Sequence, residues 1–118
     1  MATETNVVFV GWNRVVPGHE QKALEIFMTF QNLYAAKQAA GVLESFETVL
    51  LSRHGGDLNG YTILRGSHDK LHAFTHSDEF EDNLLRAEMH VTGIGVIEGW
   101  TGAAVGDLMG RWSKIIAS

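Results

Sequence analysis

Residues Asn6–Val16 read NVVFVGWNRVV, and this run decides the fold. Its β-branched and aromatic residues are typical of a β-strand. Alternate residues of a strand point to opposite faces of a sheet, so Val7 and Phe9 share one face while Val8 and Val10 share the other. Apolar residues on both faces indicate a strand that is covered on both sides.

Pro17 and Gly18 end this strand, and a helix is expected to begin near His19 and Glu20. An early acid suits the positive end of the helix dipole. The apolar stripe of this helix is formed by Leu24, Phe27, Phe30 and Tyr34. Gly41 is expected to end the helix, because glycine adopts the left-handed conformation that closes many helices.

Val42–Ser52 and Tyr61–Arg65 are two further runs that indicate strands. Between them lies RHGGDLNG, which is rich in Gly, Asp and Asn. Two strands that flank such a segment predict a hairpin with a long tip.

Ser67 is expected to cap a short helix, and Ser77 to cap a second one whose first turn is acidic. Ile94–Trp100 is predicted to be the fourth strand. A terminal helix is expected over about residues 103–117, where apolar residues recur at helical spacing. Its stripe consists of Val105, Leu108, Met109, Trp112, Ile115 and Ile116.

The predicted order of elements is β-α-β-β-α-β followed by a C-terminal helix. This order is that of the α+β class with a split βαβ, ferredoxin-like sandwich. We expect one domain over residues 1–118, with its core in residues 6–100. The terminal helix is expected to cover part of the second face of the sheet. A partner sheet is the simplest cover for the rest, so the sequence predicts a homodimer.

The composition narrows the classes of function. The formal net charge is −5, and the nine Lys and Arg residues are scattered, so we expect neither nucleic acid nor an anionic membrane as a partner. The absence of cysteine excludes disulfides, thiolate metal sites and a cysteine nucleophile. MATETN does not resemble the start of a signal peptide, and no apolar run approaches spanning length, so a cytoplasmic protein is expected.

Three histidines lie one helical turn apart in SHDKLHAFTHSDEF, at His68, His72 and His76. Two histidines at this spacing can share a zinc ion, with further ligands such as Asp69, Glu79 or His90. One ion cannot reach all three, because the outer two are about 12 Å apart along the axis. We favour surface histidines near the negative end of a helix dipole, one of them edging a pocket, and predict no metal site.

Other polar residues allow weaker hypotheses. His54 and Asp57 in the hairpin tip can form a base and its orienting partner, although a turn is the favoured interpretation. Asn13 and Arg14 follow Trp12 at the end of the first strand and can face a polar ligand group. Arg65 must pair or reach solvent, as an ion-pair partner or an anion anchor. No G-x-S-x-G or H-E-x-x-H motif is present, so hydrolysis is not expected.

The chain resembles the dimeric α+β barrel superfamily, which includes antibiotic-biosynthesis-type monooxygenases. The likeness rests on the first strand with VPGHEQKALEIF, on the hairpin into YTILRGS, and on SHDKLHAFTHSDEF. It implies two sheets paired into a barrel and a pocket between helices and sheet in each protomer. Members include cofactor-free oxygenases, isomerases and haem-degrading proteins, so the resemblance alone does not assign a reaction.

The haem-degrading branch of that superfamily implies an Asn on the first strand, a Trp ending the third and a His late in the second helix. Asn6 or Asn13 can supply the first, but Arg65 and Leu85 stand at the other two positions. Haem binding of that kind is therefore not expected, and no cofactor is predicted.

Two functional hypotheses follow. The first is a cofactor-free oxygenase or isomerase that acts on a small apolar or aromatic molecule, with one histidine as acid or base. The alternative is a non-catalytic, ligand-binding or stress-related dimer. A pocket with an inward-facing His or Arg would favour the first. The candidate pocket residues are Trp12, Asn13, Phe27, Tyr61, Arg65, His68 and Phe74.

Overall fold

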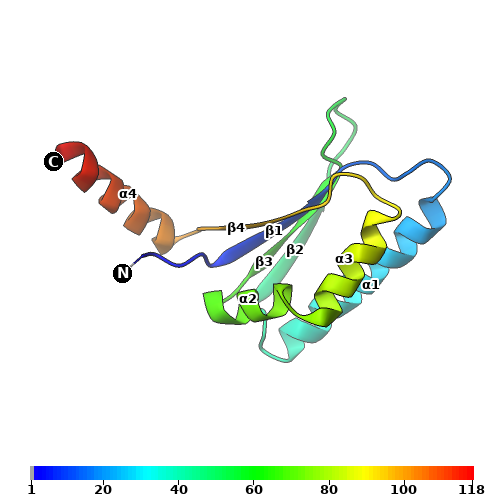
Figure 1. Cartoon of the computed structure of the whole chain (residues 1–118), viewed down its shortest axis with the longest axis horizontal. Coiled ribbons are helices and arrows are strands. Elements are labelled where there is room, and N and C mark those ends of the chain that lie inside the picture. Colours follow the sequence, from blue (N-terminus) through cyan, green and yellow to red (C-terminus); the bar gives the residue numbers. More distant parts are fainter. Residues whose placement is uncertain (1) are drawn as a thin grey trace.

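The computed structural model describes residues 2–118, and the predicted order of strands and helices is confirmed (Figure 1). The second predicted helical region is divided at Ser77, whose hydroxyl accepts a hydrogen bond from the backbone N–H of Phe80 at 3.2 Å. The elements are β1 (Val7–Trp12), α1 (Glu20–Ala39), β2 (Ser45–Leu50), β3 (Gly60–Arg65), α2 (His68–Thr75), α3 (Asp78–Glu88), β4 (Gly95–Gly99) and α4 (Ala103–Ala117).

The four strands form one antiparallel sheet in the order β2-β3-β1-β4. This is the ferredoxin-like arrangement that the sequence predicts. In the centre of the sheet, Phe9 of β1 lies opposite Ile63 of β3 and Ile97 of β4. The hairpin between β2 and β3 carries the predicted turn, in which Gly55 has a positive φ of 79°.

The helices α1, α2 and α3 all lie on one face of the sheet (Figure 1). Val8 and Val10 of β1 and Leu64 of β3 point toward them and are buried. These strand residues pack in one hydrophobic cluster with Tyr34 of α1 and Phe80 of α3. The core therefore lies between the sheet and the helices.

The opposite face of the sheet is apolar and is open in the protomer. Phe9 and Tyr61 stack on this face with ring centroids 5.1 Å apart. Ile63 is half-buried, and 58% of Ile97 is exposed. We call Phe9, Tyr61, Ile63 and Ile97 the open face. Its presence confirms that both faces of β1 and β3 are apolar.

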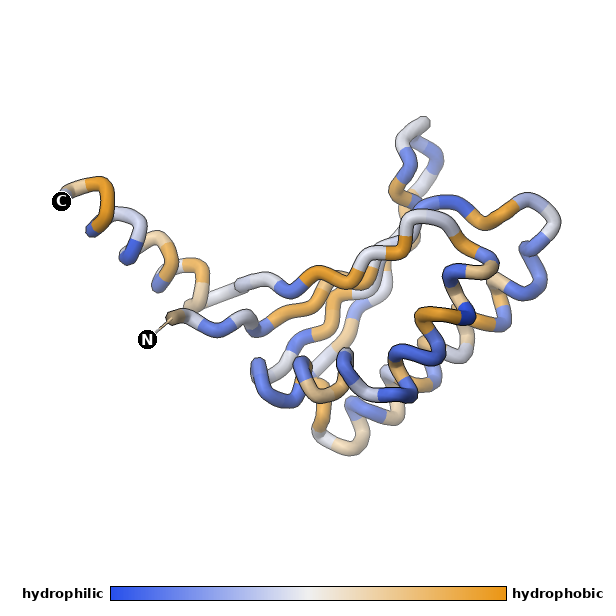
Figure 2. The backbone as a smooth tube through the Cα atoms, in the orientation of Figure 1, coloured by the Kyte–Doolittle hydropathy of each residue, from blue (hydrophilic) through white to orange (hydrophobic). Residues whose placement is uncertain are grey.

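The prediction that the terminal helix covers part of this second face is wrong for the protomer. α4 extends away from the sheet (Figure 1), and several of the residues along it are hydrophobic (Figure 2). Trp112 is 60% exposed and Ile116 is 73% exposed. The chain leaves the sheet because Gly102, with φ of 62°, turns it just before the helix.

The start of α4 is held by the N-terminal segment. The Asn6 side chain donates to the carbonyl of Thr101 and accepts from its N–H, at 3.1 and 2.9 Å. The Trp100 indole donates to the carbonyl of Thr3 at 2.9 Å. These bonds fix the end of β4 beside the N-terminal segment, so the helix begins beyond the edge of the core. Across residues 2–118, no helix combines the length and apolarity needed to span a membrane.

Candidate ligand-binding cavity

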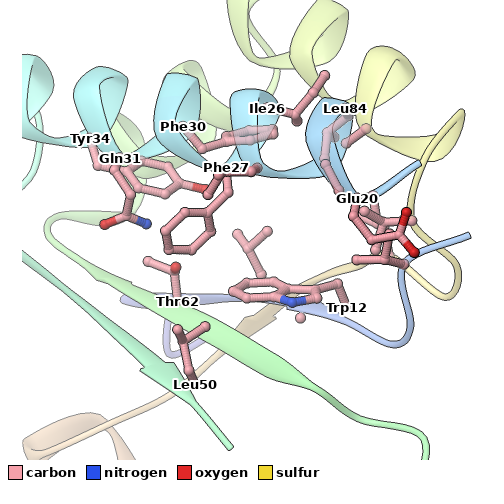
Figure 3. Close-up of a pocket in the computed structure, with 18 residues that line it drawn as sticks. Trp12, Glu20, Ile26, Phe27, Phe30, Gln31, Tyr34, Leu50, Thr62 and Leu84 are labelled. Atoms are coloured by element: carbon pink, nitrogen blue, oxygen red, sulfur yellow. The ribbon is translucent and has the colours of Figure 1, made fainter. Parts of the chain in front are cut away.

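A cavity of about 320 Å³ lies between α1, α3 and the sheet (Figure 3). This size is at the lower end of the range for small-molecule sites. Its walls are almost wholly apolar, and a gap remains where two alanines, Ala23 and Ala87, stand among larger side chains. The main aromatic and aliphatic wall residues are Trp12, Phe27, Phe30, Leu84, Val91 and Ile94.

Local periodicity explains why these side chains meet. On α1, Ala23, Phe27, Phe30 and Tyr34 follow one another at intervals of four, three and four, which places them on one face of the helix. On β1, Val10 and Trp12 are two residues apart and therefore share a face. The Trp12 and Phe27 rings meet edge to face with centroids 6.1 Å apart.

Few polar groups reach the cavity. Gln31 of α1 donates to the Thr48 hydroxyl at 2.9 Å, and Thr48 shares a hydrogen bond with Thr62 at 2.8 Å. Gln31 and Thr62 line the cavity, so this chain of bonds ties one wall to the opposite one. Of the wall residues within the described part of the chain, none is Lys, Arg or His. The cavity is therefore built for uncharged, mainly apolar molecules.

Glu20 is the acidic group at the rim. Backbone N–H groups of Glu20 and Gly18 lower the pKa of its carboxyl, and the Gly18 N–H lies 3.3 Å from Oε1. The side chain is in full contact with solvent, so it is ionised at neutral pH. A carboxylate at the rim disfavours anionic ligands.

A second histidine arrangement, which the sequence reasoning did not identify, lies beside the cavity. His19 and His90 approach with their Nδ1 atoms 2.9 Å apart. One Nδ1 atom must donate and the other accept, so the two imidazole rings cannot both be cationic in this arrangement. His19 adjoins Glu20 and His90 adjoins Val91, and both of these neighbours line the cavity. The two histidines are 71 positions apart in the chain, and no sequence pattern links them.

The predicted histidine ladder lies elsewhere, at the other end of the sheet. The rings of His72 and His76 stack with centroids 4.0 Å apart, and those of His68 and His72 lie 5.8 Å apart. His72 Nδ1 is 3.5 Å from a carboxylate oxygen of Glu98. His68 Nδ1 is within hydrogen-bonding distance of both the hydroxyl and the carbonyl of Thr5, at 3.0 and 3.1 Å.

Among residues 2–118, one set of side chains has its ligand atoms close enough to hold a metal ion. It consists of Glu4, His68 and Asp69, whose ligand atoms lie within 4.8 Å of one another. Both carboxylates are exposed. The other two residues considered as ligands are engaged elsewhere: Glu79 lies 4.0 Å from Lys37, and His90 pairs with His19. That the protein carries no metal stays a prediction.

Of the seven candidate pocket residues, Trp12 and Phe27 line the cavity. Phe74 is buried in the core against Phe80, with ring centroids 5.1 Å apart. Arg65 lies 3.7 Å from Glu47, as expected for an ion-pair partner. The remaining three also lie outside the cavity wall, and they are Asn13, Tyr61 and His68.

Asn13 lies in the segment that follows β1. Its backbone N–H donates to the carbonyl of Thr92 at 2.9 Å, and its side chain packs against Gly93. His54 in the hairpin tip approaches the carbonyl of Leu58 at 2.7 Å and accepts from the N–H of Gly56 at 3.1 Å. These local bonds support the turn interpretation of the tip.

Comparisons with known proteins agree with this fold. No family model matches the sequence, and no curated protein matches it. Among solved structures, a dimeric ferredoxin-like protein of unknown function from Bacteroides fragilis superposes with a TM-score of 0.58 and 12% identity, over 80% of this chain and 95% of that one. SnoaB, a cofactor-independent oxygenase from Streptomyces nogalater, gives a TM-score of 0.52 and 17% identity, over 83% and 96%.

A candidate antibiotic biosynthesis monooxygenase from Chloroflexus aurantiacus gives a TM-score of 0.52 and 14% identity, over 81% of this chain and 92% of that one. The predicted α+β, ferredoxin-like fold is thus confirmed for this chain. At these identities the likeness concerns the fold alone.

Proposed function

We propose that this protein binds a small, uncharged, apolar or aromatic molecule in the cavity beneath α1. The observation that carries the proposal is the cavity itself, whose wall is apolar and has no cationic side chain among the described residues. Aromatic walls with a few convergent polar groups are typical of small-molecule sites.

The proposed assembly is a homodimer that pairs the open faces of two copies. Half-buried Phe9, Tyr61 and Ile63 form an apolar surface with the exposed Ile97, and a contiguous apolar surface of this kind marks an interaction site. The Bacteroides fragilis neighbour is described as dimeric, which supports a dimer here.

A second candidate function is cofactor-free oxygenation or isomerisation of the bound molecule. The feature that favours it is the Glu20 carboxylate at the rim of the cavity, with the His19–His90 pair beside it but outside the wall. A base at this position can remove a proton from an activated C–H or O–H group of the ligand. SnoaB supports the hypothesis as a fold neighbour that is a cofactor-independent oxygenase. The described part of the cavity wall has no inward-facing His or Arg, so we favour ligand binding over catalysis.

Binding is tested with two aromatic probes, 1-ethylnaphthalene and 1-acetonaphthone, by calorimetric titration. Ala23→Leu should fill part of the cavity, because Ala23 is buried in its wall. The substitution should lower the affinity for both probes at least about tenfold. Ala35→Leu is the matched control, since Ala35 is exposed on the same helix. Failure of both probes to bind the parent protein, or equal affinities for the two variants, would contradict the proposal.

Catalysis is tested by oxygen consumption or isomer formation with 1-naphthol as the probe substrate. His90→Gln should lower the rate about a hundredfold, within the range for loss of a general base, and should leave probe affinity unchanged. No turnover in the parent protein, together with normal binding, would leave the non-catalytic ligand-binding dimer as the function.

A further inference from the structure

Tyr34 is the most buried aromatic side chain in the cavity wall, with 2% of its surface exposed. Three aromatic neighbours hold its ring: Phe30, Phe46 and Phe74 have centroids 5.8, 5.6 and 6.3 Å away. The ring extends from α1 toward the space near Phe27, Gln31 and Thr62 (Figure 3). Its direction is therefore set by packing.

Within residues 2–118 the hydroxyl of Tyr34 has no hydrogen-bond partner, yet every fully enclosed side-chain nitrogen or oxygen there does have one. The hydroxyl oxygen is therefore not sealed in the core and opens on the cavity that Tyr34 lines. The other buried polar side chains do have partners. Thr62 bonds to Thr48, the Thr75 hydroxyl donates to the carbonyl of Leu71 at 3.0 Å, and Asn83 accepts from Arg86 at 3.1 Å. A hydroxyl that opens on an apolar cavity and has no protein partner adds no hydrogen bond to the fold, and phenylalanine would fill the same space. Tyr34 is thus poorly explained as a purely structural residue.

The chemistry of the cavity restricts what the hydroxyl can bind. Burial raises the pKa of Tyr34 above its ordinary value of 10.0, so the group keeps its proton and is a hydrogen-bond donor at neutral pH. The described wall has no cation to neutralise a carboxylate or phosphate, and Glu20 lies at the rim. A neutral oxygen acceptor fits this environment, whereas an anion does not.

We propose that Tyr34 selects the ligand, by donating a hydrogen bond from its hydroxyl to a carbonyl or ether oxygen on an otherwise apolar molecule. This inference rests on the proposed ligand-binding function. It narrows the ligand class from any apolar molecule to one with a neutral acceptor placed deep in the cavity, while the rest of the molecule lies against Trp12 and Phe27.

The test compares 1-acetonaphthone, which carries a carbonyl acceptor, with 1-ethylnaphthalene, which has a similar shape and no acceptor. In Tyr34→Phe, affinity for 1-acetonaphthone should fall about threefold to tenfold, as for the loss of one neutral hydrogen bond. Affinity for 1-ethylnaphthalene should change less than about twofold, because the phenyl ring keeps the packing. Tyr61→Phe is the matched control, since it removes a hydroxyl from the open face and should change neither affinity.

The free protein supplies a second measurement. Tyr34→Phe should melt at the same temperature as the parent or higher, because it removes a hydroxyl that makes no hydrogen bond to the protein. A lower melting temperature of Tyr34→Phe, together with an equal loss of affinity for both probes, would show that Tyr34 has a structural role. This result would overturn the inference. If each probe binds Tyr34→Phe as tightly as it binds the parent, the inference about Tyr34 is overturned and the proposed binding function stays intact. Failure of both probes to bind the parent would overturn the proposed function and this inference together.

Discussion

The two faces of the sheet are built from the same kinds of residue but are in different surroundings. Val8 and Val10 of β1 are buried under the helices. Phe9, between them in sequence, points to the other face and stacks on Tyr61 in a surface that the protomer leaves open. Alternating apolar residues therefore supply a core on one side and, on the other, the open apolar surface that we propose for dimer assembly.

The contrast extends to the helices. α1 places Phe30 and Tyr34 in the core and leaves a cavity beside Ala23. α4 has an equally apolar stripe, yet Trp112 and Ile115 are mostly exposed. An apolar stripe thus does not by itself place a helix on the core of its own chain, because the packing depends on where the chain carries the helix. The predictions below test whether a second copy of this chain covers the open face and α4.

The largest effect is expected for Ile97→Glu. A carboxylate buried between two sheets would lack a partner, which should weaken the dimer by about 3 kcal/mol or more, roughly a hundredfold in its dissociation constant. Light scattering across a concentration series should show a monomer. Leu85→Glu is the control, because Leu85 is 51% exposed on α3, comparable with the 58% of Ile97 on the open face. If the parent and Ile97→Glu have the same dimer dissociation constant, the open face is not the surface through which the protein dimerises.

Trp112→Ala should weaken the dimer by about 2 kcal/mol, as expected for a buried aromatic anchor at an interface. α4 needs an external partner, because Gly106 and Gly110 each cost about 1 kcal/mol of helix propensity and an isolated helix of this length is marginal. Lys114→Ala, in the same helix outside the apolar stripe, should leave the dimer intact. Sedimentation velocity measures both. A dimer of parental strength in Trp112→Ala would show that α4 does not pack on the second copy.

On the covered face, stability should fall above about pH 10. Burial raises the pKa of Tyr34, so the unfolded chain loses this proton at a lower pH than the folded protein. Both states are protonated below about pH 10, and the free energy of unfolding then decreases as the pH rises further. Urea denaturation at pH 8 and pH 11 should show a smaller loss in Tyr34→Phe than in the parent. Tyr61→Phe, on the half-buried open face, should retain the parental loss.

The smallest effect is expected at the histidine ladder. His72 and Glu98 are both substantially exposed, so His72→Ala should lower the free energy of unfolding by less than about 1 kcal/mol. A chelator should leave the melting temperature unchanged, because we predict no structural metal. If such a metal were present, its removal would destabilise the folded state and lower the melting temperature. A clear fall with chelator would point to Glu4, His68 and Asp69 as ligands.

Sequence patterns predicted much of the fold and part of the cavity. Trp12 and Phe27 were identified because aromatic residues on a strand and on the apolar stripe of the following helix tend to meet. The sequence predicts Tyr34 on that stripe. The position of its hydroxyl, however, is set by the aromatic neighbours that hold the ring, and these come from α1, β2 and α2. His68 was expected near a pocket, yet α2 lies over the end of the sheet next to Thr5, away from the cavity.

The sequence by itself determined the order of the elements, the alternation within each strand and the apolar character of both sheet faces. These properties depend on neighbours along the chain, through the periods of the helix and the strand. Only the tertiary structure decided that a cavity remains beside Ala23 and Ala87, that His19 meets His90, and that α4 leaves the sheet after Gly102. Each of these depends on residues far apart in sequence or on the direction of one turn, because packing brings together groups that no local period relates.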